Sequence, residues 1–302
     1  GLVWRVGCPE GGRSEEKGGL GMATWQVGDV AVTKVLEIEK HWPFSALLPG
    51  AEGVIDELAW LRPDFVTDEG RMKLSIHALV LNSEGSTIIV DTCCGNDKSR
   101  PGAPPFDNLQ TDFIGELERS GYSPEDIDMV VSTHLHVDHV GWNTRLVGDT
   151  WMPTFPNAEY FFVQDEFDYW RSEPQHYGPV FEDSVQPILD AGMATIVTSD
   201  HRLTSEVALE STPGHTPGHV SVTINSAGQS ALITGDMTHH PVQFAKPGLA
   251  SSADWRQDIS TATRREAYER WSDGRLVIGT HFAGRTAGRI IAEGDAWRFD
   301  VS

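Results

Sequence analysis

The sequence predicts an α/β protein in which two mixed β-sheets stack on each other and helices cover them outside. Two halves of the chain are rich in β-like patterns, segments of helical period lie between them, and several short apolar runs end in polar residues. At 302 residues, with 39% hydrophobic residues, the chain is long enough to bury one substantial core. We therefore expect a single domain over residues 22–302.

The first 21 residues differ in composition from the rest. They are rich in glycine and charge and hold no apolar run. We interpret residues 1–21 as a tag or a disordered leader, because a clear strand pattern begins just after Met22.

The first β-rich half begins with residues 31–39, where apolar and polar residues alternate as in a half-buried strand. Residues 42–70 contain three prolines and predict a long loop with short helices at most. A hairpin should follow, because residues 74–81 and 86–90 are β-rich and the turn-forming cluster Asn-Ser-Glu-Gly separates them.

A helical segment then leads to a buried strand. Apolar residues recur at helical spacing over residues 107–121, and residues 123–126 have the cap and the proline of a short helix. Residues 127–131 form a short apolar run, directly followed by a cluster of histidines. Polar residues at the carboxyl end of a buried strand are how α/β enzymes present a site.

The second half alternates helices and short strands. We expect helices at residues 164–171, 181–191 and 260–271, and strands at residues 160–163, 195–197, 206–210, 220–225, 230–234 and 276–278.

The charge balance excludes some partners. A formal net charge of -21 would repel a nucleic acid backbone across most of the surface, so we expect a small-molecule substrate instead. No run of 18 apolar residues is present, and no membrane span is expected. Three cysteines form neither a disulfide framework nor a CxxC pair, which is typical of free thiols in a reducing, cytoplasmic compartment.

The segment Thr-His-Leu-His-Val-Asp-His at residues 133–139 carries the strongest chemical signal. It holds His134, His136, Asp138 and His139, and imidazole nitrogens and carboxylate oxygens are the ligands that Zn²⁺ prefers. A quarter of the 12 histidines in the chain lie in these few positions. The segment therefore predicts a metal site.

Three further motifs follow in order, each at the end of a predicted strand: TPGHTPGH at residues 212–219, TGD at 234–236 and GTH at 279–281. Together with HxHxDH, this series resembles the metallo-β-lactamase superfamily over about residues 74–281. The resemblance implies an αββα sandwich, with the site along the edge where the two sheets meet.

The resemblance also implies a ligand set for two divalent transition-metal ions, with Zn²⁺ as the expected metal. His134, His136 and His219 would hold one ion, Asp138, His139 and His281 the other, and Asp236 would bridge both. His215 would then only support the ligands, and Asp91 would brace the metal loop from behind.

Two bridged metals imply a hydrolytic mechanism. A metal-bridging hydroxide would attack the substrate, because the ions lower the pKa of a bound water to about 7. The residues expected to act in catalysis are Asp236, Asp138 and His239. We expect Cys93 and Cys94 to pack in a tight turn.

Within the superfamily, the chain resembles the branch of N-acyl-homoserine lactonases and methyl-parathion-hydrolase-like phosphotriesterases. The stretch GDMTHHPVQF at residues 235–244 is similar to the second group, whereas many lactonases place a tyrosine where His239 stands. The expected function is hydrolysis of a small neutral ester or lactone, and the alternative is organophosphate triester hydrolysis. A β-lactamase side activity and a non-catalytic metal-binding protein are further alternatives.

The aromatic and histidine residues near the metal motifs are candidates for the substrate pocket. These are Trp142, His240, Phe244 and Phe282, although core packing explains them almost as well. The relatives that the chain resembles are usually dimers, so a homodimer is a further expectation.

Overall fold

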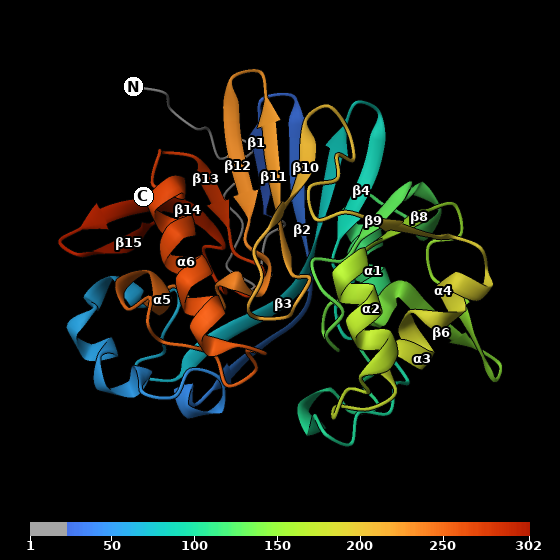
Figure 1. Cartoon of the computed structure of the whole chain (residues 1–302), viewed down its shortest axis with the longest axis horizontal. Helices are drawn as coiled ribbons and strands as arrows, with labels where there is room; N and C mark the ends of the chain where they lie inside the picture. The colour runs from blue at the N-terminus through green and yellow to red at the C-terminus, as the bar shows by residue number, and fades with distance from the viewer. Residues whose placement is uncertain (1–22) are drawn as a thin grey trace, which may run out of the picture.

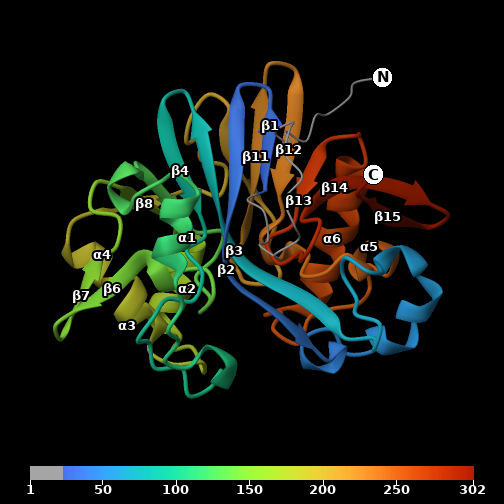
Figure 2. The same cartoon turned by 180° about the vertical axis from the view of Figure 1, so that it is seen from behind.

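The computed structural model describes residues 23–302, and the expected leader at residues 1–21 lies outside the described residues. Two large mixed sheets stack in the centre of the molecule, and helices lie on both sides of the pair (Figure 1; Figure 2). The predicted αββα sandwich is therefore confirmed.

The first sheet comes from the N-terminal half of the chain. Its strand order is β1-β2-β3-β4-β5-β8-β9, with antiparallel pairs from β1 to β4 and parallel pairs from β4 to β9. The strands are β1 (Thr24–Val27), β2 (Val30–Trp42), β3 (Met72–Ser83), β4 (Ser86–Val90), β5 (Met129–Val131), β8 (Glu159–Val163) and β9 (Ala194–Val197).

The second sheet comes from the C-terminal half and keeps its strands in chain order. Only β12 and β13 pair in parallel. The strands are β10 (Val207–Ser211), β11 (Val220–Ser226), β12 (Gln229–Ile233), β13 (Leu276–Ile278), β14 (Ala287–Glu293) and β15 (Ala296–Asp300).

Helices cover the outer face of each sheet. Those on the first sheet are α1 (Phe113–Arg119), α2 (Gln164–Ser172), α3 (Val180–Ser184) and α4 (Gln186–Asp190). Those on the second are α5 (Val242–Ala245) and α6 (Gln257–Trp271). The proline-rich loop forms the short 3-10 helices η1 (Phe44–Ala46), η2 (Ala51–Gly53), η3 (Ile55–Glu57) and η4 (Ala59–Leu61). Among the described residues, no helix is both long and apolar enough to cross a membrane.

Three apolar clusters hold these layers together. One lies between the sheets and includes Val90, Val222 and Ile278. The other two lie between each sheet and its helices, around Phe113 on α1 and around Trp271 on α6. Because both faces of each sheet are buried in this way, the strand ends at the sheet edges are the positions left for polar chemistry.

Two sequence expectations need correction. The single helix expected over residues 181–191 is two short helices, because Pro187 lies in the first turn of α4 and its missing N–H interrupts the ladder. Two hairpins were missed, namely β14 with β15 and the separate pair β6 (Thr144–Val147) and β7 (Thr150–Pro153).

Candidate metal centre and cavity

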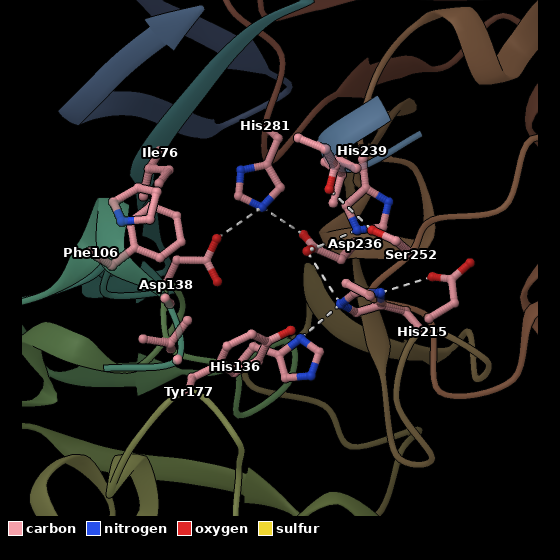
Figure 3. Close-up of a pocket in the computed structure, with 18 of the residues that line it drawn as sticks. Ile76, Phe106, His136, Asp138, Tyr177, His215, Asp236, His239, Ser252 and His281 are labelled. Carbon is pink, nitrogen blue, oxygen red and sulfur yellow. Dashed lines mark hydrogen bonds and ion pairs between the residues drawn. The ribbon is translucent and has the colours of Figure 1, made fainter. Parts of the chain in front are cut away.

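The predicted ligand motifs meet at one end of the sandwich, where strands of both sheets finish. The loop after β5 carries residues 132–139, the loop after β10 carries residues 212–219, and η8 (Gly235–Met237) follows β12. His281 follows β13 in the same way. Figure 3 shows side chains from these loops pointing toward one another around a common cavity.

One group of three histidines is His134, His136 and His215, whose ring nitrogens lie within 4.8 Å of one another. His136 Nδ1 is 2.9 Å from His215 Nε2. The other ring nitrogen of His215, Nδ1, donates to Asp254 Oδ1 at 2.9 Å, which leaves an Nε2 lone pair directed into the cluster.

A second group consists of Asp138, His139 and His281. His139 Nδ1 donates to Asp91 Oδ2 at 2.9 Å, and His281 Nδ1 donates to the Ser75 carbonyl oxygen at 3.0 Å. The Nε2 atoms of the two rings face each other at 3.3 Å. Asp138 lies against both rings, 3.6 Å and 3.7 Å from their Nε2 atoms.

Asp236 lies between the two groups. Its Oδ2 is 3.4 Å from both His139 Nε2 and His215 Nε2, and its Oδ1 is 3.0 Å from His281 Nε2. This carboxylate can therefore reach a cation in either group.

The donor set fits divalent cations. His134 Nε2 and Asp236 Oδ1 are buried without a hydrogen-bond partner, and the Nε2 atoms of His139 and His281 lie 3.3 Å apart although each ring already donates its Nδ1–H elsewhere. Buried polar atoms are rarely left unpaired, so such a set indicates a bound ion. Imidazole and carboxylate together favour Zn²⁺ or a similar transition metal.

Asp91 braces this site from behind, at the position expected from the sequence. It accepts hydrogen bonds from the backbone N–H and the hydroxyl of Thr133, at 2.7 Å and 2.9 Å, besides the one from His139. Its backbone has a φ of 57°, in the left-handed region that few non-glycine residues adopt. Such local strain is tolerated where the surrounding contacts fix the residue.

The assignment within TPGHTPGH was wrong, because the structure places His215 in the cluster and His219 outside it. His219 Nδ1 donates to the Thr212 carbonyl oxygen at 3.0 Å, and His219 Nε2 accepts the backbone N–H of Asp236 at 2.8 Å. Both ring nitrogens are thus used within the chain, and His219 positions Asp236 through its backbone.

His239 reaches the cluster from the loop after η8. Its Nε2 lies 3.3 Å from Asp236 Oδ2, and both ring nitrogens are buried without a hydrogen-bond partner. His239 also lines the cavity, so it is the imidazole best placed to contact a substrate beside the ligand groups.

Burial and charge move the pKa values of the site in opposite directions. Burial lowers the pKa of His134 and His136 well below the usual value for histidine, which keeps them neutral and able to coordinate. Burial also opposes charge on His139, but the carboxylates of Asp236, Asp138 and Asp91 outweigh it and raise its pKa well above the usual value.

The cluster forms the floor of a cavity of about 620 Å³. Its walls are largely apolar, and among residues 23–302 no Lys or Arg side chain lines it. Figure 3 shows Phe106 and Ile76 beside Asp138, with Tyr177 near His136. The aromatic side chains in the walls are Trp42, Phe106, Tyr169, Trp170, Tyr177 and Trp255.

The four residues expected to line the substrate pocket belong instead to the protein interior. Trp142 stacks on Phe113 and donates its indole N–H to Glu37. His240 donates Nε2–H to the Phe65 carbonyl oxygen and accepts the Val242 N–H at Nδ1. Phe244 and Phe282 are fully buried in the cluster around α6. Proximity to a metal motif in sequence was a poor guide, because these side chains point away from the cavity.

Three buried carboxylates that support the site were not expected from the sequence. Asp254 orients His215, Glu166 accepts the backbone N–H of Leu135, and Glu37 accepts those of Cys94 and Gly95. Glu37 occupies the register shift in β2, where a bulge re-aims its side chain. None of them lies in a metal motif, so no local signal distinguishes them from surface acids.

Comparison with known proteins agrees with the fold and motifs. A family model described as the metallo-beta-lactamase superfamily matches residues 72–270. An N-acyl homoserine lactonase of Bacillus cereus is 30% identical over 191 residues, 59% of this chain and 70% of the relative. One from a Bacillus species is 31% identical over 133 residues, so the chain spans about half (47%) of that relative's length.

Solved structures share the whole architecture. The hydrolase AbOPH of the beta lactamase superfamily superposes with a TM-score of 0.78 at 24% identity, covering 94% of this chain and 98% of its own. AidC, described as a dizinc quorum-quenching lactonase, was solved in complex with a product and gives a TM-score of 0.75 at 20% identity, covering 92% and 96%. At these identities the similarity establishes the fold.

Proposed function

This chain belongs to the metallo-beta-lactamase superfamily, and we propose that it is a metal-dependent hydrolase of small, neutral lactones and related esters. The observation that carries the proposal is a buried set of histidines and aspartates forming the floor of an apolar cavity. Structural zinc sites are usually closed, whereas this donor set opens onto space for a substrate.

We assign the ligands from the two groups described above. His134, His136 and His215 would hold one ion and Asp138, His139 and His281 the other, with Asp236 within reach of both. When bound there, two divalent ions, with Zn²⁺ as the expected metal, would supply the Lewis acidity that hydrolysis needs.

The surrounding residues prepare this chemistry. Asp91, Asp254 and the Ser75 carbonyl oxygen each accept the Nδ1–H of a ligand histidine, which fixes its tautomer and directs Nε2 inward. His239 holds a ring nitrogen free beside Asp236, where it can donate a hydrogen bond to a substrate oxygen or carry a proton to the leaving group.

The cavity favours a neutral substrate with an apolar arm. Its walls include no cationic side chain among the described residues, while Asp138, Asp236 and Asp254 all line it. An anionic substrate would find no Lys or Arg to pair with there. A lactone or ester with an acyl or aryl group gains from burial against these walls, and the lactonase relatives support the same class.

A phosphotriesterase is the second candidate, because His239 stands where many lactonases have tyrosine. Aryl phosphotriesters are also neutral, and aromatic side chains line the cavity. The same donor set would serve an attack on phosphorus.

The test is a panel assay on protein reconstituted with Zn²⁺. N-acyl-homoserine lactones, an aryl ester and methyl parathion should be compared by kcat/KM, with metal content measured on the same samples. We expect the lactones to give the highest value and two ions per chain. A higher value for methyl parathion would favour the second candidate, and no turnover of any class by the metal-loaded protein would overturn the proposal.

A further inference from the structure

We propose that Glu166 is a positioning residue that locks the two histidine-bearing loops to each other and to the aromatic wall of the cavity. The inference rests on the ligand assignment of the proposed function. Glu166 lies in the first turn of α2, is 1% exposed, and touches neither the cluster nor the cavity itself.

The contacts of Glu166 join three separate parts of the site. Its Oε1 accepts the backbone N–H of Leu135 at 3.0 Å and the indole N–H of Trp170 at 2.6 Å. Its Oε2 accepts the backbone N–H of Gly218 at 3.0 Å. Leu135 separates His134 from His136, and Gly218 follows His215 in the same loop.

The chemistry requires a carboxylate at this position. All three partners are donors, and an ionised carboxylate is acceptor-only with two oxygens. A glutamine would keep one accepting oxygen but turn its NH₂ group toward one of the donors. A buried donor left without an acceptor is destabilising, so one of the loops would have to move.

Two further observations show how tightly this region is fixed. Gln175, in the loop after α2, donates Nε2–H to the Leu135 carbonyl oxygen at 2.6 Å, so both backbone polar groups of Leu135 are held from the same segment. A Cβ atom at Gly218 would lie only 2.2 Å from the backbone nitrogen of Glu166. The loop therefore presses directly against the start of α2.

The same carboxylate links metal binding to substrate binding. The ring of Trp170 lies 5.3 Å from that of His136, and both residues line the cavity. Moving Glu166 should therefore disturb the ligand loops and the wall together, whereas moving Trp170 alone should disturb the wall.

The experiment measures Zn²⁺ affinity of metal-free protein by competition with a chromophoric chelator, which needs no substrate. Glu166→Gln should bind Zn²⁺ about 10–100-fold more weakly, the usual loss for a partner behind the ligands. Trp170→Phe should raise KM while its Zn²⁺ affinity stays within about 3-fold, because the variant keeps the other contacts of Glu166. Asp165→Asn removes the neighbouring exposed acid on α2 and should leave affinity unchanged.

Val222→Ala is the control for a general loss of stability. It leaves a cavity between the two sheets and should therefore lower Tm without lowering Zn²⁺ affinity. If Glu166→Gln fails to fold, Gln175→Ala removes the donor to the Leu135 carbonyl oxygen in the same loop and should also weaken Zn²⁺ binding. Unchanged affinity in a folded Glu166→Gln, or in Gln175→Ala when Glu166→Gln does not fold, would overturn the inference. Failure of the unmodified protein to bind Zn²⁺ would instead overturn the proposed function.

Discussion

His215 and His219 occur in the same short loop, yet their rings have opposite surroundings. His215 keeps Nε2 free toward the cluster, while His219 uses both nitrogens within the chain. We expect His215→Ala to lose one of the two ions and nearly all activity. His219→Ala should keep both ions at saturating Zn²⁺, with a loss of about 10–100-fold in affinity or activity.

Zn²⁺ titration of both variants, followed by elemental analysis and hydrolysis, checks this expectation. If His219→Ala were the variant that cannot be reloaded with metal, the ligand assignment would be reversed.

The carboxylate of Asp236 places a negative charge between the two ligand groups. Replacement by asparagine removes this charge but keeps the shape of the side chain. Asp236→Asn leaves one oxygen but no negative charge to share between two cations, so kcat should fall by more than about 100-fold, beyond the range of outer partners. The circular dichroism spectrum should stay native. Near-normal turnover in the folded variant would show that Asp236 is not the bridge.

At the residue scale, the sequence predicted the motifs well and their surroundings poorly. Asp138 and His139 were candidates from the residue types of the HxHxDH segment, whereas His281 was added by the family resemblance, and the structure brings the three together. The choice between His215 and His219 could not be predicted, since it depends on a hydrogen bond from the Asp236 backbone across two loops. Glu166 and Asp254 were missed for the same reason, because only the tertiary fold brings them to the ligands.

At the scale of elements, the buried side chain of Arg264 ties α6 to the loop that carries Asp236. Its guanidinium donates to the carbonyl oxygens of Met237, Pro247 and Leu249 and lies 4.0 Å from Asp254. Arg264→Met should lower the free energy of unfolding by about 3–5 kcal/mol, because it removes the positive charge beside the buried Asp254 and leaves the carbonyl oxygens of Met237 and Pro247 without this donor.

Urea unfolding of the Arg264→Met variant provides the measurement. Arg265→Met is the matched control, since Arg265 is the next residue of the same helix and is exposed. It removes the same charge, and the control should change stability by less than about 0.5 kcal/mol. Equal effects for the two variants would contradict the role of Arg264.

Helices and strands with a regular spacing of apolar residues could be predicted from the sequence. Elements whose conformation depends on tertiary contacts could not. The β3–β4 hairpin and α6 have clear patterns and formed as expected. The β6–β7 hairpin was missed because most of its residues are exposed on both faces, so alternation gives no signal. Strand β14 was missed for a similar reason, with its last three residues exposed.

For the whole molecule, the two stacked sheets act as a rigid base for the ligand loops. The apolar cluster between the sheets fixes the ends of β5, β10, β12 and β13 relative to one another, although these strands belong to different halves of the chain. The two β-rich halves with helices between them predicted the coarse α/β class, and the resemblance carried by the order of the motifs implied the sandwich. The cavity depends on loops between those strands, whose conformations the sequence pattern does not determine.

Buried histidines should make the metal-free protein labile to acid. Burial lowers the pKa of His219 to about 3 and that of His240 to about 4, below the value near 6.5 of an unfolded chain. As pH falls below about 6.5, the unfolded state binds protons that the folded state cannot, and stability falls until these histidines titrate. At pH 5 each should cost about 2 kcal/mol.

Two histidines have raised pKa values, which reduce the loss of stability at low pH but do not reverse it. The pKa of His139 and of His281 is raised, mainly by Asp236 against the effect of burial, so these residues add stability below about pH 6.5 that is lost as pH rises. Burial lowers the pKa of a larger set of histidines: His77, His134, His136, His219, His239 and His240.

Urea unfolding in EDTA should therefore give a lower free energy of unfolding at pH 5 than at pH 7.5. In His240→Phe this difference should shrink by about 2 kcal/mol, because one of the titrating imidazoles is gone. A flat profile between these pH values in the unmodified protein would contradict the argument.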